Sequence, residues 1–256
     1  TVVGVDTSTF KVECIQRGES PIVEKDLSSL IAAARAQGTL RATTDIASAM
    51  PGADLVLVCV GTPSRADGSL DLDHVKRACA EVGAALPHTG TYTTVVMRST
   101  MLPGSVLGEL TPVLEQASGL AMGDAFGVAY NPEFLREGTA VADFFGADYT
   151  IIGAGSVKAG ESLKAMYEGI GGELMVTSIP SAEMLTYVNK SFHALKVDIA
   201  NAVGRISMPE GISDPEVIRI MARTQEFHMS HKYLSRGLRT SGHRRPRAPP
   251  TQQRSA

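Results

Sequence analysis

Three apolar segments of the chain each end in small polar or charged residues of the kinds that bind ligands or move protons. These segments are residues 56–63, 95–100 and 127–137. Apolar runs that stop so abruptly are typical of buried parallel strands whose carboxyl ends open onto a ligand crevice. Hydroxyls and carboxylates gathered at one such edge can hydrogen-bond a ligand or activate water, so the sequence predicts a site there.

The candidate site residues are two threonines and two glutamates. Thr62 could contact a cofactor phosphate or ribose, or could be an ordinary turn residue. Thr100 could line the same site or cap the helix that follows it. Glu133 and Glu137 would share one face of a helical turn, where two like charges are either solvated or used to poise a base or bind water. Their joint occurrence at consecutive strand ends favours a site over four separate structural roles.

The first apolar run, residues 2–6, ends in the carboxylate of Asp6. In dinucleotide-binding folds an acid at the end of the second strand binds the ribose hydroxyls, about twenty residues after a Gly-x-Gly-x-x-Gly turn. That turn would precede Thr1 here, so Asp6 could equally well cap the following helix. The run would also suit the adenosine ribose of a methyltransferase cofactor, although such an enzyme has no need of the two glutamates.

The elements that must position these residues alternate between strand and helix along most of the chain. Strands are expected at residues 2–6, 40–43, 55–60, 94–98, 127–130, 149–152 and 174–177. Helices are expected at residues 9–17, 27–37, 45–50, 72–86, 105–117 and 158–167, and residues 131–148 are expected to form a loop. The alternation predicts an α/β fold with a doubly wound parallel Rossmann-like sheet. Its first strand is expected to be missing, which would leave the strands at 2–6 and 55–60 separated by a gap or newly paired.

From residue 181 the pattern becomes that of one long helix over residues 181–208, with a further helix at residues 214–222. Apolar positions recur along the long helix at spacings of three and four, at Met184, Tyr187, Val188, Phe192, Leu195, Ile199 and Val203. We expect this stripe to drive a homodimer or a sticky oligomer, unless the helix folds back onto its own sheet. Lys190 and Lys196 could bind a pyrophosphate or belong to a solvated face.

Composition bounds the class of protein. The 256 residues, 43% of them hydrophobic, suffice for one large domain and part of another. No apolar run approaches the ~20 residues of a membrane span, and no signal peptide is visible. Three cysteines without a Cys-x-x-Cys pair indicate a reducing cytoplasm, so we expect a cytoplasmic protein. The six histidines show no metal-ligand pattern, and we expect no metal site.

Charge divides the chain unevenly. Residues 235–256 hold six arginines and no acid, whereas residues 1–234 hold 18 basic and 27 acidic side chains, a net charge of −9. Such an acidic body is unlike a nucleic-acid-binding protein. The basic end could be an RNA-binding arm, but its composition favours a disordered tail, and it resembles a gene read out of frame. The change of pattern near residue 181 and the change of charge near residue 235 divide the chain into an incomplete Rossmann-like domain at 1–178, a helical region at 179–234 and the tail at 235–256.

Several motifs occur along the chain in a characteristic order and spacing: Ser20-Pro21-Ile22-Val23-Glu24, Val60-Gly61-Thr62-Pro63-Ser64, Arg98-Ser99-Thr100, Asn131-Pro132-Glu133-Phe134-Leu135-Arg136-Glu137, Ala182-Glu183-Met184 and Phe192-His193-Ala194-Leu195-Lys196-Val197. In these motifs the chain resembles the UDP-glucose/GDP-mannose dehydrogenase family over residues 1–234, which implies that the domain at 1–178 binds NAD and that the region at 179–234 forms a dimer. Together these motifs are far more specific than any one alone. The Ser-Pro-Ile-Val and Phe-His-Ala pieces resemble the GDP-mannose branch of the family more closely than the UDP-glucose branch.

The resemblance implies an oxidoreductase of polysaccharide biosynthesis with NAD as its cofactor and a nucleotide sugar, GDP-mannose or UDP-glucose, as its substrate. The family oxidises the sugar C6 alcohol to the uronate with two NAD, through a cysteine-bound thiohemiacetal and thioester. By the resemblance, Asp6 and Lys11 hold the adenosine ribose region, while Thr62 and Thr100 line the NAD site.

The resemblance also assigns the residues nearest the reaction. Glu137 would contact cofactor and substrate near the hydrolytic water, with Glu133 beside it, so that Glu137, Thr100 and Glu133 form the candidate catalytic set. His193 and Asn201 match nucleotide-sugar contacts on the long helix, which in the family forms the dimer core.

The chain departs from the family at several catalytic positions. Thr186 stands where the family has the Lys that stabilises an oxyanion, and losing a comparable group costs on the order of 100-fold or more in rate. Lys190 stands where the family has an Asn. The nucleophilic cysteine is expected in a Gly-Gly-Ser-Cys motif soon after Leu234, but no cysteine follows Cys79.

These departures predict a chain truncated at both ends and inactive as it stands. It should not oxidise GDP-mannose or UDP-glucose, and it should bind NAD poorly because the helix N-terminus that receives the pyrophosphate is missing. The alternative is a non-catalytic fragment or pseudoenzyme that dimerises or weakly binds nucleotide.

Overall fold

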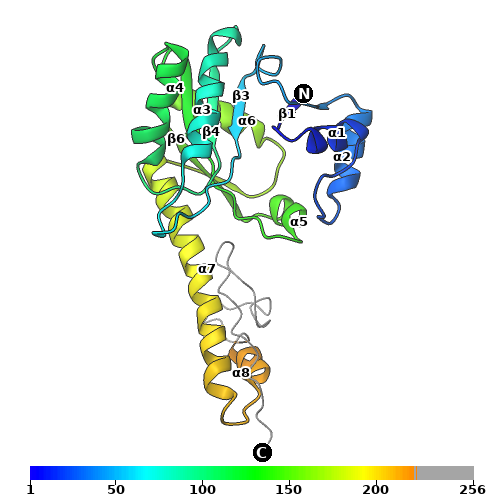
Figure 1. Ribbon diagram of the computed structural model, residues 1–256, viewed down its shortest axis with the longest axis vertical. Coiled ribbons are helices and arrows are strands. Elements are labelled where there is room, and N and C mark those ends of the chain that lie inside the picture. The colour runs from blue at the N-terminus through cyan, green and yellow to red at the C-terminus, as the bar shows by residue number, and fades with distance from the viewer. Residues whose placement is uncertain (222, 224–256) are drawn as a thin grey trace, which may run out of the picture. The chain divides into compact units, whose positions relative to one another are not determined.

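The structure, a computed structural model, describes residues 1–221 and 223. Two compact units are present, Thr1–Tyr187 and a second that begins at Val188. The first unit holds two separate sheets (Figure 1). In the smaller sheet β1 (Val2–Val5) and β2 (Leu40–Thr43) pair in parallel. Among the described residues β1 does not pair with the larger sheet, which matches the gap expected between the strands at 2–6 and 55–60.

The larger sheet has five strands in the order β3-β4-β5-β6-β7. They are β3 (Leu55–Val58), β4 (Thr93–Met97), β5 (Phe126–Tyr130), β6 (Tyr149–Ala154) and β7 (Glu173–Thr177). The pairs β3–β4, β4–β5 and β6–β7 are parallel, whereas β5 and β6 are antiparallel. The expected α/β sheet is confirmed as parallel-dominated. The alternation of strand and helix did not reveal the reversal at β6, because both strand directions produce the same sequence pattern.

Helices cover both faces of this sheet, as the alternation of side chains along its strands shows. Val95 and Met97 of β4 belong to one apolar cluster with α3 (Asp73–Ala85) and α4 (Thr111–Ser118), while Val96 faces another with α6 (Val157–Met166). Successive residues of a strand point to opposite faces, so β4 is buried on both. The carboxyl ends of β3, β4 and β5 are thereby held at a common edge.

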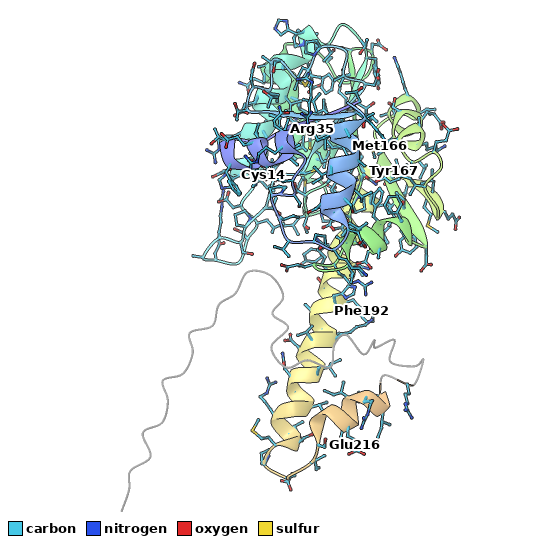
Figure 2. All side chains as sticks on the ribbon, turned by 90° about the vertical axis from the view of Figure 1, so that its right-hand side faces the viewer. Cys14, Arg35, Met166, Tyr167, Phe192 and Glu216 are labelled. Atoms are coloured by element: carbon cyan, nitrogen blue, oxygen red, sulfur yellow. The ribbon has the colours of Figure 1, made fainter. Side chains whose placement is uncertain are left out.

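The smaller sheet is joined to its helices by hydrogen bonds from the half-buried Arg35. Helix α1 (Thr9–Arg17) begins after the N-cap Ser8 and ends at Gly18, whose φ of 79° allows the left-handed turn that stops the helix. On α2 (Leu27–Ala36), Arg35 donates to the Leu40 carbonyl at 2.7 Å and to the Gln16 carbonyl at 3.2 Å. Figure 2 shows Arg35 on α2 beside Cys14, the buried residue of α1.

Three local expectations differ from the structure. Residues 45–50 form turns rather than a helix, with Asp45 accepting the Ala47 N–H at 3.0 Å. The helix expected at 105–117 begins as a π-helical turn, η2 (Val106–Leu110), before α4. Pro112 has no N–H to donate and interrupts the regular α-helical ladder there. The expected loop at 131–148 contains a short helix, α5 (Ala140–Phe145). A 3-10 turn, η1 (Leu86–His88), extends α3.

The long helix is confirmed as α7 (Ile179–Ser207), and α8 (Asp214–Met221) follows it. Within the second unit, Ala200 and Val203 of α7 pack with Ile218 and Met221 of α8. The side chain of Phe192, which projects from α7 in Figure 2, is 48% exposed and that of Leu195 is 53% exposed. None of the helices formed by the described residues combines the length and apolarity that a bilayer crossing requires. The tail expected at 235–256 lies outside the described residues.

Candidate functional site

Side-chain hydroxyls join the loops that follow β3 and β4. The Thr62 hydroxyl donates to the Thr100 carbonyl at 2.9 Å, and the Ser99 hydroxyl donates to the Val60 carbonyl. The structure therefore brings the two predicted threonines together at the carboxyl edge of the sheet. Because the single hydroxyl proton of Thr62 is donated to Thr100, the Thr62 oxygen can act only as an acceptor toward a ligand.

A buried polar network fixes the next strand end. Asn131 is fully buried; its Oδ1 accepts from Arg98 and from the Tyr167 hydroxyl at 2.6 Å, and its amide donates to the Ile151 carbonyl at 2.8 Å. Arg98 also donates to the Tyr167 oxygen at 2.9 Å. These bonds tie β4, β5, β6 and the end of α6 together. Asn131 is thus structural, and the contribution of Tyr167 to this network was not predicted from the sequence.

Glu133 and Glu137 lie in the loop after β5 and not on a helical turn, so the shared face that such a turn would give them does not form. Residues 131–136 are irregular and 137–139 form a turn. The residue before a proline is pushed into an extended conformation, so Pro132 opposes a helix starting at Asn131. Glu133 is half-buried and accepts the Leu135 N–H at 2.9 Å, whereas Glu137 is exposed.

Two contacts hold the loop that carries Glu137. Asp143 of α5 accepts from the main-chain and side-chain nitrogens of Arg136, at 3.0 and 2.9 Å, and from the Thr139 hydroxyl at 2.9 Å. The Arg136 guanidinium, together with Thr139, holds the pKa of Asp143 well below its ordinary value. On the other side of Glu137, Glu24 accepts the Gly138 N–H at 2.8 Å and the Ala140 N–H at 3.1 Å.

Asp6 and Lys11 lie together beside α1. The Asp6 carboxylate accepts the Ser8 N–H at 2.9 Å and pairs with the Lys11 ammonium at 2.9 Å. The hydrogen bond from Ser8, followed by that from Lys11, lowers the pKa of Asp6. Ser8, not Asp6, is the N-cap of α1. The Asp6 side chain remains 38% exposed and charged, as a ribose-binding carboxylate must be.

The first turns of α7 also reach this edge of the sheet. Glu183 is fully buried and accepts the N–H groups of Gly104 and Val106 at 2.6 and 2.9 Å. Glu183 thus caps the start of η2, a role that the sequence had offered to Thr100. Thr186 is buried and donates to the Ala182 carbonyl at 2.9 Å. The sequence marked Glu183 as part of a motif but assigned it no role.

Thr186 borders the Tyr130 hydroxyl, which donates to the Ser99 carbonyl at 3.2 Å. Burial raises the pKa of Tyr130, partly offset by its hydrogen bond with Thr186. The position where the resemblance expects a lysine is therefore filled by a neutral side chain. His193 and Asn201 lie further along α7, in the second unit, and stay predictions. The Lys196 ammonium there lies 4.4 Å from the centroid of the Phe192 ring.

The surroundings of Cys59 and Cys79 disfavour the thiolate form of their side chains. Cys59, just beyond β3, keeps some contact with solvent, but desolvation by the protein around it raises the pKa of its thiol; Arg98 opposes this rise and Glu133 adds to it. Burial raises the pKa of Cys79 to about 12. Because the thiolate is the reactive form, neither thiol is activated.

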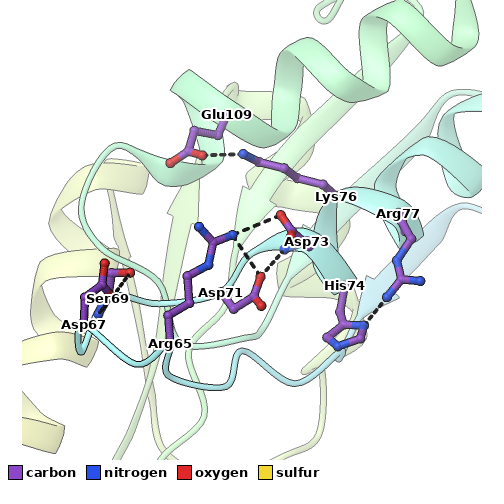
Figure 3. Close-up of polar contacts among 9 residues, drawn as sticks. All are labelled: Arg65, Asp67, Ser69, Asp71, Asp73, His74, Lys76, Arg77 and Glu109. Atoms are coloured by element: carbon purple, nitrogen blue, oxygen red, sulfur yellow. Dashed lines mark hydrogen bonds and ion pairs between the residues drawn. The ribbon is translucent and has the colours of Figure 1, made fainter.

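A groove of about 450 Å³ lies between the loop after β3 and the loop after β4. Its charged lining residues are already ion-paired (Figure 3): Arg65 with Asp71 and Asp73, both at 3.2 Å, and Lys76 with Glu109 at 2.7 Å. None of the residues predicted for the site lines this groove. Within the described part of the chain, no three His, Cys, Asp or Glu residues gather as metal ligands.

Comparisons with known proteins agree on one family. Residues 1–171 match the model of the NAD-binding domain of the UDP-glucose/GDP-mannose dehydrogenase family. A GDP-mannose 6-dehydrogenase of Pseudomonas syringae pv. tomato is 41% identical over 94% of this chain and 55% of its own length. A UDP-glucose 6-dehydrogenase of Haloferax volcanii is 35% identical over 94% of this chain and 56% of its own length.

Solved structures give the same result. A ternary complex of GDP-mannose dehydrogenase from Pseudomonas aeruginosa superposes with a TM-score of 0.84 at 38% identity, covering 91% of this chain and 54% of that one. A UDP-glucose dehydrogenase of Pyrobaculum islandicum gives a TM-score of 0.82 at 33% identity, covering 91% and 53%. The chain spans about half the length of the relatives it matches.

Proposed function

Because the chain belongs to the UDP-glucose/GDP-mannose dehydrogenase family, we propose that it contributes the NAD site and part of the catalytic site of a nucleotide-sugar 6-dehydrogenase. Such an enzyme oxidises the C6 alcohol of GDP-mannose or UDP-glucose to the uronate. The observation that carries the proposal is the contact of Thr62 with Thr100 at the edge that also bears the 131–137 motif. GDP-mannose is the favoured substrate, since the GDP-mannose enzyme above is the more similar of the two curated relatives.

The polar groups at the edge fit the ribose parts of NAD. Asp6 is a charged, partly exposed carboxylate, the acceptor that ribose hydroxyls require, and Lys11 keeps it ionised. Thr62 presents an oxygen that can accept from a cofactor hydroxyl or amide. NAD, when bound, supplies the hydride acceptor for the oxidation. The chain's own residues bind and orient: Asp6 and Lys11 at the adenosine ribose, Thr62 and Thr100 toward the reacting end.

Glu137 is the residue we propose to act on water, with Glu133 and Thr100 beside it. Its exposed carboxylate can accept a proton from water or a substrate hydroxyl, while the half-buried Glu133 is held by Leu135. Tyr130 and the neutral Thr186 lie by Ser99, next to Thr100, so the position where the resemblance expects a lysine brings no positive charge to an oxyanion. His193 and Asn201 are proposed to contact the nucleotide sugar.

We expect that this chain alone does not complete the oxidation. A thioester route needs an activated thiol, whereas Cys59 has a raised pKa and Cys79 is buried. The alternative function, nucleotide binding or dimerisation without catalysis, is favoured by the same observation. An assay for NADH formation with GDP-mannose and NAD separates the two, because sustained turnover above the protein-free rate would exclude the non-catalytic reading.

Binding tests the proposal without requiring turnover. Calorimetric titration of NADH into the chain should give saturable, weak binding that Asp6→Asn lowers by about tenfold, as expected for a charge-assisted hydrogen bond. The matched control is Asp67→Asn, which changes an exposed carboxylate bonded to Ser69 and should leave the affinity unchanged. Equal effects of both substitutions, or tight binding that neither alters, would contradict the placement of NAD at Asp6.

A homodimer through α7 is also proposed. Phe192 and Leu195 leave about half of their surfaces exposed, and burying each such side chain is worth roughly 1.5–3 kcal/mol. Sedimentation at micromolar concentration should therefore show a dimer or larger species, and Phe192→Glu combined with Leu195→Glu should return it to monomer. A wild-type monomer with the helix intact by circular dichroism would refute the interface.

A further inference from the structure

Glu137, the residue placed closest to the chemistry, is exposed, so the groups that fix its position must lie in its neighbours. The main-chain N–H on either side of it is hydrogen-bonded to a carboxylate. Arg136 N–H donates to Asp143 at 3.0 Å, within the same loop and helix. Gly138 N–H donates to Glu24 at 2.8 Å. The path of the backbone through residue 137 is therefore set from both sides.

Glu24 comes from a distant part of the chain. It precedes α2, next to the smaller sheet, and its partners lie 114 and 116 residues further along the sequence. Both of its carboxylate oxygens are used, Oε2 by Gly138 and Oε1 by Ala140. A two-oxygen acceptor facing two N–H groups is a match that glutamine cannot reproduce, because one of its two terminal groups is a donor.

The segment that carries Glu24 is itself fixed. The Ser20 hydroxyl donates to the Ile22 carbonyl at 2.7 Å and accepts the Ile22 N–H at 3.3 Å. At the receiving end Gly138 has a φ of 84°, a conformation that most side chains disfavour. A preorganised turn thus presents its carboxylate to a loop with an unusual backbone, and this loop needs external hydrogen bonds to hold its shape.

We propose that Glu24 is a positioning residue for Glu137. It links the part of the fold that carries Asp6 to the loop that carries Glu137, so that the cofactor-binding and water-activating residues keep a fixed relation. This role rests on the proposed function, because that function assigns Glu137 its task. The hydrogen bonds between Glu24 and the loop do not depend on the proposed function. Arg136 and Asp143 shape the loop from within, and Glu24 anchors it from outside.

Amide hydrogen exchange of the chain by NMR tests the link without any ligand. In Glu24→Gln one terminal oxygen can still accept, so the exchange of at least one of Gly138 and Ala140 should accelerate roughly tenfold or more, as expected for loss of a hydrogen bond to a charged acceptor, while core amides of β4 keep their protection. In Glu24→Asp the carboxylate remains but is one methylene further from the loop, so the exchange should accelerate less than in Glu24→Gln. The control Glu19→Gln alters an exposed carboxylate paired with Arg17 and should change neither amide. Unchanged exchange at both Gly138 and Ala140 in Glu24→Gln would overturn the proposal.

A double-mutant cycle tests whether Glu24 acts through Glu137. NADH affinity is measured for Glu24→Gln, Glu137→Gln and the double variant. If Glu24 positions Glu137, the double variant should bind no more weakly than Glu137→Gln alone, because the positioned group is already gone. If Glu24 had only a structural role, Glu24→Gln would lower the NADH affinity by the same factor whether or not Glu137 is also replaced. Full additivity of the two losses would therefore refute positioning. If neither the wild-type chain nor any variant binds NADH, the proposed function fails while the exchange result still decides the link.

Discussion

Replacing Glu183 should cost more stability than replacing any exposed carboxylate of the chain. Its buried oxygens accept the N–H groups of Gly104 and Val106 at 2.6 and 2.9 Å. Glu183→Ala would leave the buried Val106 N–H without an acceptor, at about 1–3 kcal/mol. It would also lose the bond from the exposed Gly104 N–H, which water can replace, at about 0.5–1.5 kcal/mol, so the loss should be about 1.5–4.5 kcal/mol together. Since a domain is stable by about 5–15 kcal/mol, such a variant could fail to fold. In Glu183→Gln the side-chain oxygen can still accept the buried Val106 N–H, and we expect a loss of about 1–2 kcal/mol.

Urea unfolding followed by circular dichroism measures this loss, provided that the slope with denaturant stays the same. The matched control is Glu115→Gln. Glu115 also accepts a main-chain N–H, that of Met122 at 3.0 Å, but it is half-buried and water can replace the bond. The control should cost less than about 1 kcal/mol. Equal losses in the two variants would show that burial of Glu183 does not matter and would refute the reasoning.

The same residue gives an unusual dependence on pH. Burial raises the pKa of Glu183 above its ordinary value of 4.5, despite the N–H groups that lower it. When folding raises the pKa of a carboxyl group, that group contributes most to stability at pH values below its pKa in the unfolded state. The contribution is lost as the pH rises through its pKa in the folded state. The difference in unfolding free energy between wild type and Glu183→Gln should therefore widen as the pH falls from 7 toward 4.5. A difference that narrows on acidification would contradict the direction of the pKa shift.

Two further predictions concern packing and charge. Gly83→Ala would place a methyl group between α3 and α4, 2.8 Å from the Ala117 Cβ and 2.9 Å from the Leu114 carbonyl oxygen. Urea unfolding should therefore show a loss of about 1–3 kcal/mol in the free energy of unfolding. The control is Gly108→Ala, whose added Cβ meets nothing within 4 Å. Asp143→Asn should destabilise the chain at pH 7 and flatten its loss of stability in acid, because a depressed carboxyl pKa contributes stability above its unfolded value of 3.8 that disappears as pH falls through the folded pKa. An Asp143→Asn variant with the same acid transition as wild type would contradict that assignment.

Elements with local signals could be predicted from the sequence. Helix α1 has the predicted bounds because Ser8 and Gly18 cap its two ends with residue types that favour those conformations. Helix α7 was predicted from the spacing of its apolar residues, which recurs over many turns. The carboxyl edge of the sheet was predicted from three runs that end in polar residues, and Thr62 and Thr100 do lie together there.

Features that depend on distant partners could not be predicted. Glu183 reaches back 77 and 79 residues to its two N–H donors, and Glu24 reaches forward by more than one hundred. The helical turn considered for Glu133 and Glu137 rested on their spacing alone, and Pro132 and the contacts of Asp143 favour an irregular loop instead. Helix α5 is short, and the sequence of residues 131–148 was taken for a loop.

The most direct measurement is an NMR titration of the chain with NAD, following the amides of the 60–63 loop, the 98–101 loop and the residues around Asp6. If NAD occupies the carboxyl edge of the sheet, the amides of Thr62, Thr100 and Lys11 should shift together with one saturation curve, and Asp6→Asn should weaken that curve. Shifts confined to the groove lined by Arg65, Lys76 and Glu109, or no saturable shift at millimolar NAD, would contradict a cofactor site at this edge.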